Sequence, residues 1–275
     1  MKKSSVVSLA LKWTILIIVM LAIYLPLAVI IIYSFSSAKS VGGNFGNFTL
    51  SLYSKLFEDA ELLDATKNTL LIGLVSSVLA TLLGTTAAIG IHYMRRKSRA
   101  IVDASSQITI VNTEIVTAMG FYSLMLFLRD TLQLPVNFSM FYLIIAHTVI
   151  STPYVILTVS PRLKQLNPNL LEASMDLGAS PMRSLITVML PQLAGAMISG
   201  FALAFTLSLD DFVITHVNSY SVGIGTISTY VYTKMKHNIP NQIRALSTII
   251  FTVVLIVLVI YNIAKNKKAK QQSLH

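Results

Sequence analysis

Three carboxylates stand inside otherwise apolar stretches of this chain: Glu114, Asp210 and Asp211. A carboxylate in the hydrocarbon of a membrane costs about 2.5–3.5 kcal/mol on insertion scales, so it normally faces a cavity or a polar partner. Acids in such places can bind a cation or a proton. They can equally hydrogen-bond a neighbouring helix or cap a helix end. The residue types alone leave both roles open.

The places of the three acids along their stretches differ. Glu114 lies about ten residues into the stretch 105–128, which is roughly 15 Å at helical rise and near the middle of a bilayer. Asp210 and Asp211 lie about 20 residues after Pro191, so we expect them near the outer mouth. Adjacent residues of a helix point about 100° apart, so the two aspartates should not face one cavity equally.

The stretches around these acids indicate an integral membrane protein. Of the 275 residues, 54% are hydrophobic and only 12% are charged, which is too little charge to cover a soluble domain. Several stretches reach about 20 residues, enough to cross a hydrocarbon core of ~30 Å. A single membrane domain over residues 1–275 is the simplest organisation.

We expect an all-α protein with six membrane-spanning helices. Their expected bounds are residues 13–35, 68–93, 105–128, 138–160, 192–214 and 246–264. Six crossings place both termini on one side. Fourteen of the 21 Lys and Arg residues fall on that side, so the positive-inside rule places both termini and segment 161–191 in the cytoplasm. The net charge of +10 is therefore interpreted as a topology signal, with no nucleic-acid partner.

Several kinds of chemistry are excluded or disfavoured. The chain has no cysteine, which excludes disulfides, thiol catalysis and Cys-ligated zinc. None of its 12 glycines opens a G-x-x-x-x-G-K-[ST] loop, and neither H-E-x-x-H nor G-x-S-x-G occurs. We therefore expect no enzyme activity, no metal and no cofactor in this chain. His147, alone in the fourth expected span, is predicted to hydrogen-bond a neighbouring helix.

A long segment, residues 36–67, is expected on the outer side. It holds an acidic cluster made of Glu58, Asp59, Glu61 and Asp64. This cluster could receive a docking protein, or it could be a solvated loop face.

Residues 161–191 form a polar island between the fourth and fifth expected spans. Asn167 followed by Pro168 is a helix start, and Gly178 suits the position after a helix that needs a positive φ. A second Ser-Pro start follows at Ser180. The polar island thus predicts two short helices joined at a glycine. The first could dock into a groove of a soluble partner or lie on the lipid surface.

The polar island resembles the EAA loop of ABC-importer permeases. That pattern is Glu-Ala-Ala, then Gly, Ile and Leu-Pro at fixed spacing, and this chain differs from it only at Ser174 and Val188. The resemblance implies the type I ABC importer permease fold. It also implies that Glu172, Ala173 and Gly178 belong to a cytoplasmic coupling helix, which fits a groove on an ATPase subunit.

Further segments resemble the spermidine/putrescine permease branch of this family. They include FTLSLDDFVITHV at 205–217 and AHTVISTPYVILTVSPRLK at 146–164. The resemblance implies a path for polyamines, whose ammonium groups need spaced carboxylates with aromatic faces between them. The expected path residues are Glu114, Asp210, Asp211, Tyr122 and Tyr154.

The resemblance implies partners as well. These are a second homologous permease, two copies of an ATPase that binds ATP and Mg, and an extracytoplasmic polyamine-binding protein, assembled in a bacterial plasma membrane. Two alternatives stay open: an ABC permease for another small solute, and a gradient-driven cation carrier that uses the intramembrane carboxylates. The coupling pattern favours the ABC permease, because a secondary carrier has no use for an ATPase-docking helix.

Overall fold

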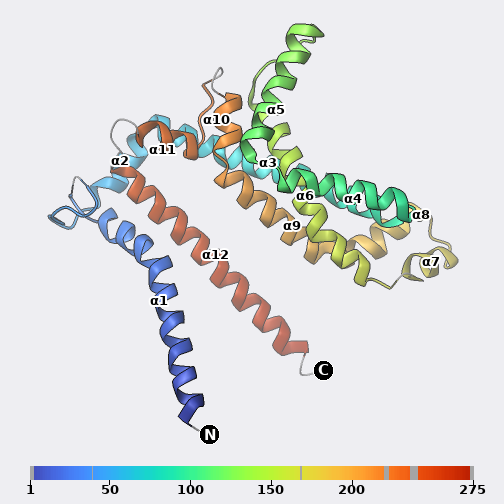
Figure 1. Cartoon of the computed structure of the whole chain (residues 1–275), viewed down its shortest axis with the longest axis horizontal. Helices are drawn as coiled ribbons and strands as arrows, with labels where there is room; N and C mark the ends of the chain where they lie inside the picture. Colours follow the sequence, from blue (N-terminus) through green and yellow to red (C-terminus); the bar gives the residue numbers. More distant parts are fainter. Residues whose placement is uncertain (1–2, 39, 168, 220–222, 236–240, 273–275) are drawn as a thin grey trace. The chain divides into compact units, whose positions relative to one another are not determined.

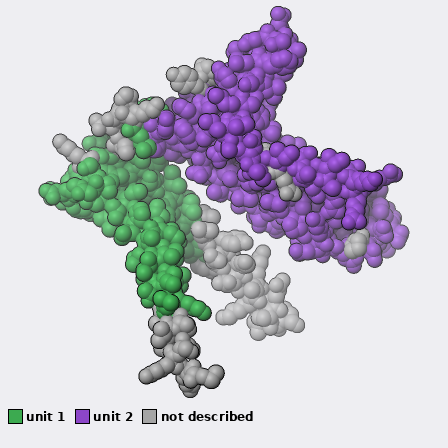
Figure 2. Space-filling view, viewed as in Figure 1, with its two compact units in different colours: residues 1–63, 233–275 green, residues 64–232 purple. Residues whose placement is uncertain are grey.

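The computed structural model describes residues 3–38, 40–167, 169–219, 223–235 and 241–272. These residues are almost entirely helical, and their only β-pairing is an isolated bridge between Ser36 and Phe48. The expected all-α class is confirmed. The chain divides into two compact units, one formed by Met1–Leu63 with Thr233–His275 and the other by Asp64–Tyr232 (Figure 2).

The first unit contains α1 (Lys3–Ser34), α2 (Ser51–Glu58) and α12 (Gln242–Gln272), and α12 packs against both other helices (Figure 1). None of the apolar window of α1 is buried, as expected for a helix that faces lipid. At the start of α12, buried Arg244 donates to the carbonyl oxygens of Tyr33 and Ala38, at 3.3 and 2.8 Å. The guanidinium thus satisfies carbonyl groups at and beyond the last turn of α1.

The second unit holds most of α3, most of α11 and all the helices between them. They are α3 (Ala60–Tyr93), α4 (Arg96–Val111), α5 (Glu114–Leu126), α6 (Met140–Gln165), α7 (Asn169–Asp176), α8 (Pro181–Ser184), α9 (Leu190–Asp210), α10 (Val213–Ser219) and α11 (Ile227–Met235). Two π-helical turns, Phe127–Thr131 and Leu185–Met189, extend α5 and join α8 to α9. In the described part of the chain, four helices are long and apolar enough to cross a membrane: Leu11–Ser34, Ala60–Tyr93, Met140–Gln165 and Pro181–Asp210.

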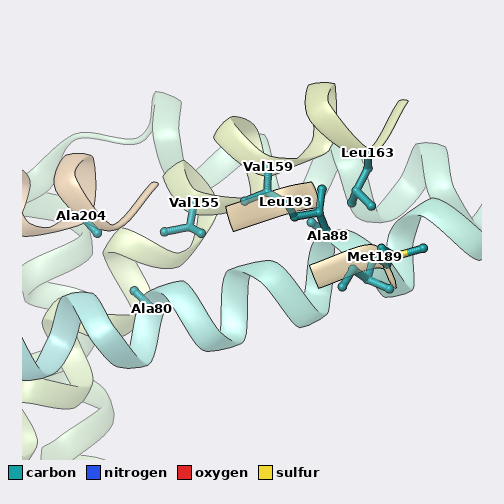
Figure 3. Packing of buried hydrophobic residues seen from close by; sticks show 9 residues of the cluster. Ala80, Ala88, Val155, Val159, Leu163, Met189, Leu193 and Ala204 are labelled. Carbon is teal, nitrogen blue, oxygen red and sulfur yellow. The ribbon is translucent and has the colours of Figure 1, made fainter. Parts of the chain in front are cut away.

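The core of the second unit lies where α3, α6 and α9 meet (Figure 3). Val155 of α6 is fully buried there. A Cβ on Gly84 would lie 2.6 Å from the Val155 Cβ, and one on Gly200 would lie 3.2 Å from its Cγ1. The two glycines therefore make room for one valine, and the absence of their side chains lets the three helices approach closely.

The third expected span is not one helix. In place of a continuous helix over 105–128, α4 ends at Val111 and α5 begins at Glu114. Asn112 and Thr113 between them are extended, with ψ of 146° and 141°. Asn and Thr side chains compete with helical hydrogen bonds and favour helix ends. Glu114 therefore lies in the first turn of a helix and not ten residues into one.

The fifth expected span begins earlier and ends sooner than 192–214. Helix α8, the π turn and α9 run continuously from Pro181 to Asp210. The expected span begins just after Pro191, but this proline lies in the first turn of α9, directly after the π turn. The wider hydrogen-bond spacing of a π turn accommodates the missing N–H of a proline. The second helix of the polar island and the fifth span are therefore one element.

Candidate functional site

A pocket of about 150 Å³ lies in the second unit, where α5, α6 and α9 come together. It is lined by Glu114, Asp210, Asp211, Tyr154 and His147 among others, and we call it the carboxylate pocket. Four of the five expected path residues thus share one cavity. The fifth, Tyr122, is not part of its lining.

The two adjacent aspartates have different surroundings. Asp211 is extended and follows directly after Asp210, the last residue of α9. Its Oδ1 accepts from the Ile214 N–H at 3.2 Å, and its Oδ2 accepts from the N–H and the hydroxyl of Thr215, both at 2.9 Å. Asp211 therefore caps α10, the structural role that the sequence left open. Asp210 is exposed, and neither its carboxylate nor that of Glu114 has a hydrogen bond or an ion pair within the described chain.

Behind Asp211 lies a buried hydrogen-bonded chain that we call the polar chain. The His147 Nδ1 lies 2.7 Å from the Ser208 Oγ, and its Nε2 lies 3.1 Å from the Thr215 Oγ1 and 3.5 Å from the Asp211 Oδ2. Ser76 extends it to α3, with 3.3 Å between the two serine hydroxyl oxygens. The predicted interhelical role of His147 is confirmed, and it joins α6 to α9 and α10.

The first helix of the polar island forms as predicted. The N–H of Asn169 donates to the Asn167 Oδ1 at 3.0 Å, while Pro168 lies outside the described residues. At the other end, Gly178 has φ of +89° and donates to the Met175 carbonyl at 2.8 Å.

The N–H of Ala179 donates to the Ser174 carbonyl at 3.2 Å. Together with the bond from Gly178, this is a Schellman motif, in which the residue after the helix needs a left-handed backbone.

Helix α7 has one anchored face and one free face. Leu171 packs against the core cluster of α3, α6 and α9. Glu172 and Ala173 are exposed, and Leu177 is 90% exposed. A small cavity of about 30 Å³ beneath the helix is lined by Leu171, Met189 and other residues of this region. Helix α7 therefore packs on the core through Leu171 and leaves Glu172, Ala173 and Leu177 uncovered in the described structure.

Residues 80–266 match the family described as "Binding-protein-dependent transport system inner membrane component". The chain belongs to this family. This match confirms the family that the EAA-loop resemblance indicated. It also confirms that the protein lies in a membrane.

Two curated relatives cover most of the permease. It is 30% identical over 251 residues to the spermidine/putrescine transport system permease protein PotC of Escherichia coli K12, covering 90% of this chain and 91% of that one. It is 32% identical over 237 residues to the putrescine transport system permease protein PotI of the same strain, covering 86% and 83%.

A solved structure shares the fold. It is a bacterial ABC transporter involved in the import of the acidic polysaccharide alginate, and its matching chain has a TM-score of 0.71 at 16% identity. The match covers 94% of each chain. The expected ABC-importer permease fold is confirmed.

Three acids of the acidic cluster make hydrogen bonds or ion pairs within the permease itself. Asp59 accepts from the Leu62 N–H at 3.0 Å, near the start of α3. Lys234 lies 2.7 Å from Glu61, and this hydrogen bond raises the pKa of the lysine above its ordinary value. Asp64 pairs with neighbouring Lys67 at 3.4 Å. These contacts favour a solvated face over a docking patch, but the face is not a loop, because Glu58 ends α2 and Glu61 and Asp64 belong to α3.

Some pocket residues escaped the sequence analysis. Phe212 lines the carboxylate pocket, and its ring lies 4.9 Å from that of His216 and 4.5 Å from that of Tyr232. Tyr122, an expected path residue, lies outside this lining, and its ring stacks on that of Phe138 at a centroid distance of 5.3 Å. The adjacency of Phe212 to the aspartates was the available signal.

Proposed function

We propose that this permease forms the path for a polyamine, spermidine or putrescine, in a binding-protein-dependent ABC importer of a bacterial plasma membrane. The observation that carries the proposal is the carboxylate pocket, in which Glu114 and Asp210 hold carboxylates without a partner in the described chain. The names of the relatives PotC and PotI support a polyamine as the solute.

The chemistry of the pocket suits a flexible polycation. Glu114 begins α5 and Asp210 ends α9, so the two carboxylates come from different helices and can bind separate ammonium groups. Tyr154 and Phe212 line the same cavity and supply aromatic faces for the cation between them. A few exposed contacts of this kind bind weakly, which suits a transporter that must also release its solute.

Coupling to ATP hydrolysis is assigned to α7. Its free face, with Glu172 and Ala173, would fit a groove on an ATPase subunit, and Gly178 would end the helix at the correct place. Leu171 would pass the movement to the core of α3, α6 and α9. The remaining partners are a second ATPase copy, a second homologous permease and an extracytoplasmic polyamine-binding protein. The charge distribution supports a cytoplasmic position for α7 and both termini.

The test is ATP-driven uptake of labelled spermidine and putrescine into proteoliposomes that hold the complete complex. Asp210→Asn should raise the KM about tenfold or more, because a charge-assisted hydrogen bond contributes about 1.5–3 kcal/mol. Asp130→Asn is the matched control, since Asp130 is exposed, lies outside the pocket lining and pairs with Arg129 at 2.7 Å. A wild-type complex that hydrolyses ATP but accumulates neither polyamine would contradict the proposal.

A further inference from the structure

The polar chain leaves its members little freedom. His147 is 3% exposed, Thr215 is fully buried, and the Asp211 side chain is 7% exposed. Unpaired polar groups at such depth are costly, so every hydrogen bond in the polar chain matters for where its members lie.

All hydrogen bonds of the polar chain can donate in the same direction. The Thr215 hydroxyl donates to the Asp211 Oδ2, so its oxygen is left to accept from the His147 Nε2–H. The other ring nitrogen then accepts from the hydroxyl of Ser208 at 2.7 Å. The oxygen of Ser208 accepts in turn from Ser76. With a neutral His147 imidazole, each member of the polar chain therefore donates to the next, from Ser76 to the carboxylate of Asp211.

Asp211, the last member of the polar chain, lies where α9 ends. The Asp211 N–H makes the final bond of α9, to the Leu207 carbonyl at 3.1 Å, while its side chain accepts from the amides of Ile214 and Thr215 in the first turn of α10. Both Asp211 oxygens are thus engaged by the protein. Asp210, the residue immediately before this stop, keeps an exposed carboxylate.

We propose that His147 is a positioning residue: through Asp211 it holds the end of α9 so that Asp210 presents its carboxylate to the solute. Asp210 contacts the solute, and Asp211 belongs to the frame. The identity of the solute rests on the function proposed above, but the division of roles between the two aspartates does not.

A double-mutant cycle in the complete complex tests this positioning role. His147→Ala should raise the KM for polyamine about fivefold and change the maximal rate less, as a coupled pair would. In the Asp210→Asn background, His147→Ala should raise the KM no further. Thr148→Val is the matched control, because Thr148 is equally buried on α6 but donates only to Ile144 of its own helix. Effects that multiply in the double variant would overturn the proposal.

Two conservative variants separate positioning from a loss of folding. His147→Gln keeps a donor for Thr215 and should restore most of the wild-type KM. Asp211→Ser keeps an N-cap acceptor without a charge and should resemble the wild type more closely than Asp211→Ala does. If Asp211→Ser raises the KM as much as Asp210→Asn, Asp211 itself binds the solute and the proposal is wrong.

A readout without any solute makes the two proposals separable. The chain has no cysteine, so Leu207→Cys puts a single thiol of this chain in the pocket lining. Its labelling rates with a cationic and an anionic methanethiosulfonate give a charge preference, with the complex lacking this cysteine as background. Asp210→Asn and His147→Ala should each lower the cation preference several-fold, whereas Thr148→Val should not.

The labelling result and the uptake result answer different questions. An unchanged preference in the His147→Ala variant would overturn the positioning role, whatever the solute is. The expected preference pattern in a complex without polyamine uptake would support the positioning role and reject the proposed solute.

Discussion

Two helix ends lie beside residues with a proposed function: the end of α7 and the junction between α9 and α10. These two helix ends are formed by different kinds of contact. The end of α7 consists of two backbone hydrogen bonds within one short segment. Gly178 donates to the Met175 carbonyl, and Ala179 donates to the Ser174 carbonyl. At Asp211 the end depends on side chains from α6, α9 and α10. The first is therefore a local structure, and the second exists only in the packed unit.

This difference suits what each end is proposed to do. A docking element must keep its shape while the helices below it move, and a local helix end does so. A solute site must change when the helices move, and a junction held by several helices can respond to that movement. Leu171 of α7 packs against the core of α3, α6 and α9, whose buried residues Figure 3 shows, and α6 and α9 also carry residues of the carboxylate pocket.

The largest effect on transport is expected from Gly178→Leu, because it acts on the proposed coupling to ATP hydrolysis. No atom lies within 4 Å of a Cβ added there, so the cost comes only from the φ of +89°. Such a backbone costs an L-residue about 1–2 kcal/mol, and a displaced α7 should uncouple ATP hydrolysis from uptake. Transport and ATPase activity stimulated by the binding protein are measured together in proteoliposomes.

Gly178→Asn is the control for this local end, because Asn adopts the left-handed backbone more readily. It should retain most of the coupling. Wild-type coupling in the Leu variant would show that α7 does not need its glycine end.

An intermediate effect is expected from Thr215→Val. It removes a hydroxyl that connects His147 to Asp211, so it leaves buried polar groups unpaired at a cost of about 1–3 kcal/mol. Thr148→Val removes a hydroxyl bonded inside one helix and should cost less. Thermal unfolding of the detergent-solubilised permease compares them, and equal losses would contradict the importance of the interhelical connection.

The smallest effect is expected from Asn167→Ala. It removes the acceptor for the Asn169 N–H at the start of α7, a loss that typically costs about 0.5–2 kcal/mol. Asn167→Asp should retain the cap. Uptake should fall modestly in the Asn167→Ala variant, and less than in the Gly178→Leu variant. This result would show that the glycine end of α7 matters more for transport than its N-terminal cap.

Local patterns accounted for much of the fold. Hydropathy predicted the apolar helices, and helix-end preferences at Asn167 and Gly178 predicted the bounds of α7, because these signals involve residues a few positions apart. The assignment of Glu172 and Ala173 came from the resemblance to the EAA loop. The break at Asn112 and Thr113 was equally local but lay inside an apolar stretch, and the hydropathy of that stretch concealed the helix-ending preference of its two polar residues.

The sequence by itself determined a helical membrane protein with a polar island whose first helix ends at a glycine. It also singled out three acids inside apolar stretches. Only the tertiary structure decided that Glu114 and Asp210 share a cavity, and that Asp211 is a cap. Those outcomes depend on contacts between α5 and α10 and between α6 and α9 (Figure 1). Segments so distant along the chain meet only through packing, which no spacing rule within a single helix describes.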